Sequence, residues 1–197
     1  TSWGKDSTVL CHLAWSLYAE RIQVVWVNRR PYDNPDCELV RDAFLARFPL
    51  RYHEEILECE LASSGGWQVV GVPLRGVSTQ PKQVGFARVQ ARFGPRYVSG
   101  VRAEESSVRK KRVATGLSTR NTCAPLGNWL ADDVFAYLIR HDLPIHPAYA
   151  CTAGRAFDPR RLRVGSIGGP HGRGHGRQEW ERLYYGDAIR AQRAPHL

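Results

Sequence analysis

The first residues of the chain, TSWGKDST, have the types and spacing of an anion-binding loop. Gly4 would let the backbone approach an anion closely, Lys5 would neutralise phosphate oxygens, and Asp6 would accept hydrogen bonds from the loop or orient Mg²⁺. We expect Ser7 and Thr8 to cap the following helix and to turn their hydroxyls toward the anion. A glycine turn that leads into a helix also presents backbone N–H groups and the positive end of the helix dipole. The loop therefore predicts a phosphate site.

A second group of candidate residues follows the stretch RYVSG. This stretch reads as a strand that ends at Gly100 and Arg102, and the carboxyl edge of an open α/β sheet is where such proteins bind ligands. We therefore expect Arg102 to meet the same anion as Lys5. Glu104 and Glu105 could orient the nearby cations or hold a metal.

The segment after Arg102 adds positive charge through Arg109, Lys110, Lys111 and Arg112. A solvated face is the favoured interpretation for the two lysines. Asp132 and Asp133 read as residues at a helix start that complement the dipole, not as catalytic acids.

The hydrophobic pattern predicts alternating helices and strands around these residues. Helices are expected over 7–20, 37–48, 83–93 and 130–142, and strands over 22–27, 52–57, 67–74 and 96–102. This order favours an α/β fold with an open, mostly parallel sheet and helices on both faces. The chain contains no methionine, so we expect that its N-terminus is trimmed and that a first strand is missing in front of Thr1.

Length and composition favour one nucleotide-binding domain over residues 1–164, followed by a glycine- and arginine-rich segment over 165–197. The net charge of +9 comes from the second half, because residues 1–74 carry 7 basic and 10 acidic side chains whereas residues 75–150 carry 12 and 5. Such a field attracts the phosphates of a nucleotide or a nucleic acid. The arginine bias could also come from genome base composition.

Other classes of protein are disfavoured. No apolar run reaches the length of a membrane span, and the first residues lack a signal-peptide profile, so we expect a cytoplasmic protein that does not bind membranes. The five cysteines are dispersed without a CxxC pair, so neither a disulfide framework nor an iron–sulfur site is expected. His171 and His175 lie in a glycine-rich stretch, a poor setting for a metal site.

Three motifs resemble one known family. SWGKDS resembles the SGGKDS pyrophosphate loop of the N-type ATP pyrophosphatases, with Trp3 where that family usually has glycine. GVRAEESSVRKKR and APLGNWLADDVFAYLIRHDLPIHPAYA resemble two segments of the PAPS (phosphoadenosine phosphosulfate) reductase-like branch of this PP-loop superfamily. The branch also includes the catalytic subunit of bacterial ATP sulfurylase and DNA phosphorothioation enzymes. The resemblance implies an adenine nucleotide alpha hydrolase-like fold.

Residue patterns and resemblance together assign the candidate site. The expected catalytic residues are Lys5, Asp6 and Arg102. The expected phosphate-binding residues are Ser2, Gly4, Ser7, Thr8, Arg109 and Arg112, and the expected nucleotide or substrate contacts are Gly100, Glu105, His146 and Tyr149.

The resemblance leaves three functions open. We expect an enzyme that cleaves ATP, with Mg²⁺, between the α and β phosphates and adenylylates an acceptor in sulfur metabolism or nucleic-acid sulfur modification. A PAPS reductase is the alternative; such an enzyme needs a cysteine thiolate, and the family's C-terminal cysteine motif has no counterpart in IRAQRAPHL, which leaves Cys123 or Cys151. The third reading is a non-catalytic nucleotide- or DNA-binding module. The expected partners are an adenine nucleotide and either a nucleic acid or a partner subunit.

Overall fold

The computed structural model describes residues 1–19, 21–63, 65–72, 78–150, 160, 162–168 and 177–193. Helices and strands alternate along most of this part of the chain. The helices are α1 (Lys5–Tyr18), α2 (Asp36–Arg47), α3 (Pro81–Phe93), α4 (Ser107–Ala114), α5 (Ala131–Arg140) and α6 (Arg177–Arg193), with short 3₁₀ turns at Ala103–Glu105 and Pro147–Ala150. The strands are β1 (Gln23–Arg30), β2 (Arg51–Leu61), β3 (Trp67–Val69), β4 (Tyr97–Val98) and β5 (Thr122–Cys123).

The central sheet has the order β1-β2-β3. β1 and β2 are parallel, with Gln23 opposite Arg51, whereas β3 turns back antiparallel to β2. β4 and β5 form a separate parallel pair with Tyr97 opposite Thr122. The parallel pairs and intervening helices confirm the predicted α/β class.

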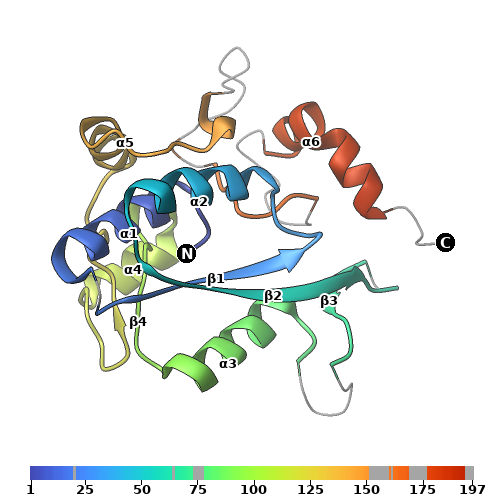
Figure 1. Ribbon diagram of the computed structural model, residues 1–197, viewed down its shortest axis with the longest axis horizontal. Helices are drawn as coiled ribbons and strands as arrows, with labels where there is room; N and C mark the ends of the chain where they lie inside the picture. Colours follow the sequence, from blue (N-terminus) through green and yellow to red (C-terminus); the bar gives the residue numbers. More distant parts are fainter. Residues whose placement is uncertain are drawn as a thin grey trace.

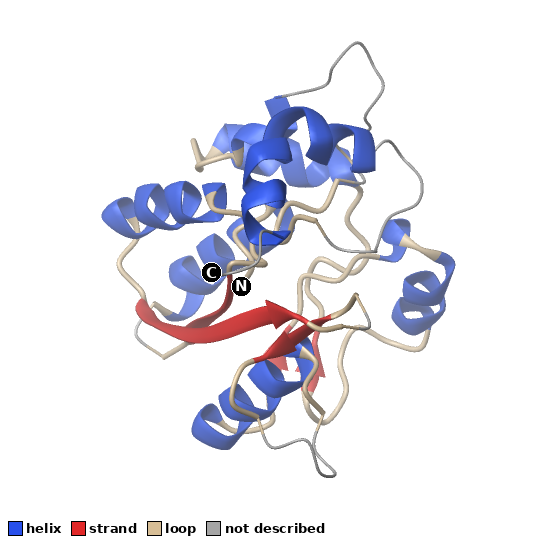
Figure 2. Ribbon diagram, turned by 90° about the vertical axis from the view of Figure 1, so that its right-hand side faces the viewer, coloured by secondary structure: helices blue, strands red, loops and turns tan. Residues whose placement is uncertain are grey.

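Helices cover both faces of the central sheet, as predicted. Figures 1 and 2 show α3 below β1 and β2, and α1 and α2 on the other side. α3 lies very close to β1, because a Cβ on Gly85 would come 2.4 Å from Val27 Cγ1. A larger residue at position 85 would push the helix off the sheet.

The main core lies between the sheet and helices α1, α2 and α5. α5 contributes Val134 and Leu138, which are four residues apart and share one helix face. Trp26 from β1 and Phe44 from α2 fill the centre, and both are almost completely buried. The amphipathic pattern that predicted these helices therefore corresponds to real burial.

A second core joins α6 to the segment before it. Trp180 and Tyr185 of α6 pack with Val164, Ile167 and Tyr149. The packing therefore crosses position 164, where the sequence placed the boundary between domain and tail, and that division remains a prediction. Of the glycine-rich stretch, residues 169–176 lie outside the described residues, as do His171 and His175.

Two predicted strands are much shorter than expected. The prediction over 96–102 reduces to Tyr97–Val98, and that over 67–74 to Trp67–Val69. The first is limited by its partner β5, which supplies only two paired residues. The second is the return arm of a hairpin that turns at Gly65, where φ is +81°.

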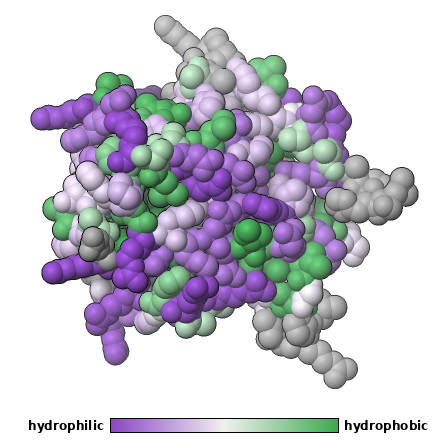
Figure 3. All heavy atoms as spheres, in the orientation of Figure 1, coloured by the Kyte–Doolittle hydropathy of each residue, from purple (hydrophilic) through white to green (hydrophobic). Residues whose placement is uncertain are grey.

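The exposed surface is largely polar. Figure 3 shows hydrophilic residues over most of one face, with apolar residues in small separate patches. Within the described residues, no helix is both long enough and apolar enough to cross a membrane.

Candidate active site

Trp3 anchors the loop at the N-terminus of α1 in the hydrophobic core. This residue has φ of 53°, in the left-handed region, and its indole is completely buried against Phe44 and Tyr52. The position where the related loop usually has glycine thus keeps a glycine-like backbone while its side chain anchors the loop in the core. Gly4 follows without room for a side chain, because a Cβ would lie 3.3 Å from both Tyr149 Oη and Val164 Cγ2.

The predicted caps of α1 are wrong. The helix begins at Lys5 and its N-cap is Gly4, so Ser7 and Thr8 already lie inside the first turn. Ser7 Oγ donates a hydrogen bond to the Gly4 carbonyl at 2.9 Å. Thr8 is buried. The ligand-facing end of α1 is therefore formed by backbone groups more than by hydroxyl caps.

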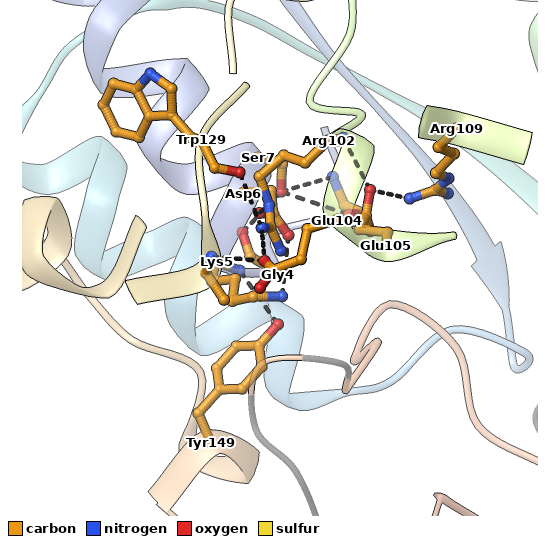
Figure 4. Close-up of polar contacts among 12 residues, drawn as sticks. Gly4, Lys5, Asp6, Ser7, Arg102, Glu104, Glu105, Arg109, Trp129 and Tyr149 are labelled. Atoms are coloured by element: carbon orange, nitrogen blue, oxygen red, sulfur yellow. Dashed lines mark hydrogen bonds and ion pairs between the residues drawn. The ribbon is translucent and has the colours of Figure 1, made fainter. Parts of the chain in front are cut away.

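Asp6 joins the two cations that the sequence placed at one anion. Its Oδ2 lies 3.1 Å from Lys5 Nζ, and its Oδ1 accepts from Arg102 Nε at 2.5 Å. Figure 4 shows Arg102 between Asp6 and Glu104, with Lys5 beside them. Lys5 and Arg102 are 4% and 0% exposed, so both charges lie in a region of low dielectric where their fields are weakly screened.

Arg102 is fixed on several sides. Its Nη1 donates to Glu104 Oε2 at 2.6 Å and to the Trp129 carbonyl at 3.3 Å, and its backbone N–H donates to Glu105 Oε2 at 3.0 Å. Burial disfavours the charged guanidinium, but the carboxylates of Asp6 and Glu104 outweigh this effect and raise the pKa of Arg102. Nη2 is buried without a hydrogen-bond partner.

Tyr149 closes the loop from the side opposite Arg102, as the close-up shows. Its hydroxyl oxygen accepts from the Lys5 backbone N–H at 3.3 Å, and Lys5 Nζ lies 5.4 Å from the ring centroid. Burial, followed by the nearby charge of Asp6, raises the pKa of the phenol well above its usual range. Tyr149 is thus a neutral residue that positions the loop.

A cleft of about 790 Å³ opens in front of this cluster. This volume is in the range of small-molecule sites. Among the predicted site residues, the cleft is lined by Ser2, Gly4, Asp6, Ser7, Gly100, Glu105, Arg109 and Tyr149. Lys5 and Arg102 do not line the cleft, but both contact Asp6, which does. The structure therefore brings the loop, the end of the β4 segment and the 3₁₀ turn at Pro147–Ala150 to one site.

Besides Lys5 and Arg102, three predicted residues do not line the cleft. Thr8 is buried within α1. Arg112 is exposed on α4, with Nη2 3.5 Å from Thr122 Oγ1. His146 is 1% exposed, and its Nδ1 accepts from the Ala148 N–H at 3.2 Å. Burial lowers the pKa of His146 to about 4, so this histidine is a neutral structural residue near pH 7.

The prediction of a structural role for Asp133 is confirmed. Asp133 Oδ2 accepts from the Leu130 N–H at 2.8 Å at the start of α5, as expected for a helix-start residue. Trp129 packs against the main core.

The sequence reasoning missed one wall of the cleft. Arg29, Tyr32 and Trp67 all line it, and so does Arg163. Arg29 is held by Asp33 at 2.5 Å and lies 4.9 Å from the Tyr32 ring centroid. Arg29 and Tyr32 come from the end of the predicted parallel strand β1, so the rule that ligands bind at carboxyl edges could have found them.

The cysteines fall into two groups. Cys11, Cys37 and Cys59 are buried, and burial raises the pKa of each thiol, to about 12 for Cys59. Cys123 is exposed, although it does not line the cleft. Cys151 lies outside the described residues.

The described lining offers few free ligands for Mg²⁺, and the expected Mg²⁺ stays a prediction. Mg²⁺ prefers free carboxylate oxygens and water. Asp6 uses both oxygens on Lys5 and Arg102, and Glu105 accepts from the Arg102 N–H and pairs with Arg109. The acidic side chains of the described lining are therefore occupied by cations, which suits the binding of an anion.

An α/β fold with a loop at a helix N-terminus and a buried arginine beside it is the arrangement expected of a nucleotide-binding protein of the PP-loop type. The comparisons with known proteins narrow this class. Residues 82–170 match the family described as phosphoadenosine phosphosulfate reductase domain. The chain is also 27% identical, over 157 residues, to a phosphoadenosine 5'-phosphosulfate reductase of Synechococcus sp., covering 76% of this chain and 67% of that protein. These matches agree with the resemblance of the three motifs to the PAPS reductase-like branch of the PP-loop superfamily.

Proposed function

We propose that the chain binds phosphoadenosine phosphosulfate in the cleft and takes part in the reductive release of sulfite from it. The observation that carries this proposal is the Lys5–Asp6–Arg102 cluster under the α1 N-terminus. The helix dipole at this loop would stabilise a phosphate anion, and the two cations would offset the carboxylate of Asp6 beside it. The comparisons support this substrate over ATP, because both carry the name of a phosphosulfate reductase.

The proposed reaction needs a thiolate. A cysteine thiolate attacks the sulfur, the sulfur–oxygen bond to the phosphate breaks, and adenosine 3',5'-bisphosphate leaves with the electron pair. A second thiol then attacks the resulting S-sulfocysteine, which forms a disulfide and releases sulfite. The cluster under the loop would stabilise the negative charge that develops on the leaving phosphate.

The second candidate function is the cleavage of ATP to pyrophosphate with adenylylation of sulfate or a nucleic-acid oxygen. One observation favours it: among the described cysteines, three are buried and Cys123 lies outside the cleft lining. Adenylyl transfer needs no thiol, so it could proceed with the groups that line the cleft.

One pair of assays separates these functions. Purified protein would be incubated with phosphoadenosine phosphosulfate and a dithiol, with sulfite as the readout, and in parallel with ATP, Mg²⁺ and sulfate, with pyrophosphate as the readout. We expect the wild-type protein to release sulfite. If the chain itself supplies the nucleophile, Cys123→Ser or Cys151→Ser should abolish sulfite release. Pyrophosphate without sulfite would replace our proposal by the second candidate. Nucleotide binding without either product would favour the third interpretation, a non-catalytic nucleotide-binding module.

A further inference from the structure

The wall of the cleft that the motifs do not include contains two aromatic side chains beside Arg29 and Arg163. Tyr32 and Trp67 both line the cleft, and their ring centroids lie 5.3 Å apart at an interplanar angle of 41°. They come from different elements, since Tyr32 follows β1 and Trp67 begins β3. Figure 1 shows that the end of β1 and the β2–β3 hairpin point to the same side of the molecule.

One side of the Trp67 side chain packs against the hydrophobic core. Part of its side chain packs against the cluster of Leu57, Cys59, Val69 and Val84, and the residue is half-buried. The remainder lines the cleft. An indole that is anchored on one side and open on the other is a surface on which a flat ring can stack.

Tyr32 is also held in place. Its carbonyl accepts from the Ile167 N–H at 3.2 Å, and the guanidinium of Arg29 lies 4.9 Å from its ring centroid. Arg29 in turn is paired with Asp33, which is 7% exposed. The aromatic wall is therefore pre-organised, and little conformational freedom remains to be lost when a ligand binds.

The lining of the cleft combines two kinds of group. The loop at the start of α1 contributes Gly4, Asp6 and Ser7, and the segments at β1 and β3 contribute Tyr32 and Trp67. A ligand with an anionic group and a flat aromatic ring matches this pairing. Inorganic phosphate or sulfate alone would leave the aromatic wall without a contact.

We propose that Trp67, supported by Tyr32, is the stacking surface for the purine ring of the nucleotide whose phosphates bind at the loop. This assignment rests on the proposed function, because it needs a nucleotide in the cleft. Trp67 lies before the residues 82–170 that match the family domain, so the β2–β3 hairpin supplies a contact that the matched segment does not contain.

Binding titrations with two probes test the assignment. Adenosine 3',5'-bisphosphate carries both base and phosphates, whereas inorganic pyrophosphate carries only the anionic part. Trp67→Leu keeps an apolar contact with the core but loses the aromatic face, and Trp67→Phe keeps an aromatic ring. We expect Trp67→Leu to weaken binding of the bisphosphate about tenfold and to leave pyrophosphate binding unchanged. Trp67→Phe should retain most of the affinity.

The neighbouring residue provides a matched control. Gln68 is the next residue of β3, points to the opposite face of the strand and donates to Glu60 Oε1 at 2.8 Å. Gln68→Ala should bind both probes like the wild type. Unchanged bisphosphate affinity in Trp67→Leu would overturn the stacking assignment, as would an equal loss for pyrophosphate, which indicates a structural effect. Wild-type protein that binds neither probe would instead overturn the proposed function itself.

Discussion

Asp6 and Arg102 are 96 positions apart in the chain, yet their Oδ1 and Nε atoms lie 2.5 Å from each other. This contact fixes the first turn of α1 to the segment that follows β4. Glu104 extends the connection, because its Oε2 accepts both from Arg102 Nη1 and from the Ala131 N–H at the start of α5. The phosphate loop is therefore braced by residues from three separate parts of the chain.

Arg102→Leu should destabilise the fold. The change removes the buried cation and leaves the carboxylates of Asp6 and Glu104 facing each other. We expect a loss of about 2–3 kcal/mol in the free energy of unfolding, below the full effect for a buried pair because these side chains are 19% and 35% exposed. Urea unfolding followed by circular dichroism measures it. Arg112→Leu, on the exposed face of α4, is the control, and equal midpoints for the two variants would contradict the role of Arg102.

The stability of the protein should depend on pH through His146. Burial lowers its folded-state pKa from 6.5 to about 4. Between these pH values the unfolded chain binds a proton that the native state does not bind, so the free energy of unfolding falls as the pH falls. The total contribution is about 3 kcal/mol, lost from pH 6.5 downward and complete near pH 4. Urea titrations from pH 7 to pH 4 should show a shallower decline for His146→Asn, and parallel curves would exclude this histidine as a cause.

Trp3→Gly should destabilise the protein even though glycine suits the backbone at this position. Glycine relieves a left-handed conformation that costs a side-chain-bearing residue roughly 1–2 kcal/mol. The lost indole, however, fills space between Phe44 and Tyr52, and emptying such a site costs about 3–5 kcal/mol. We expect a net loss of about 2 kcal/mol, with Trp3→Phe intermediate, measured by urea unfolding. A Trp3→Gly variant as stable as the wild type would mean that the indole adds nothing to the anchoring of the loop.

The native protein should react with thiol reagents at Cys123 before the buried cysteines. Cys123 is exposed, whereas burial shields Cys11, Cys37 and Cys59 and keeps them protonated. Brief treatment with iodoacetamide, followed by peptide mass mapping, compares the modified fractions at these positions. Modification of Cys37 at the rate of Cys123 would show that the core opens more readily than its packing implies.

The sequence brought the loop and Arg102 together because each obeys a local rule, and their role in ligand binding stays a prediction. A glycine before an amphipathic helix and an arginine after an apolar strand both point to one edge of a sheet, whatever the rest of the fold. The same rules failed for Ser7 and Thr8. The backbone of Trp3 and Gly4 lets α1 begin at Lys5, two residues before the start that the helical pattern predicts.

Trp67 and α6 show two further limits of prediction from the sequence. Trp67 enters the cleft because the β2–β3 hairpin folds back beside β1, and no short motif encodes that packing. α6 did carry a signal, since Trp180 and Tyr185 are buried and Ile189 packs against them. The preceding glycines and arginines dominated the composition and concealed the helical pattern.

Lys5→Ala tests the central claim most directly, because its ammonium is buried under the loop and paired with Asp6. Calorimetric titration with adenosine 3',5'-bisphosphate and with inorganic pyrophosphate would compare this variant with the wild type and with Lys110→Ala on the exposed face of α4. The account predicts that Lys5→Ala weakens the binding of both ligands, because the carboxylate of Asp6 at the cleft loses a neutralising cation, and that Lys110→Ala does not. Equal affinities in all three proteins would contradict the placement of the phosphates at this loop.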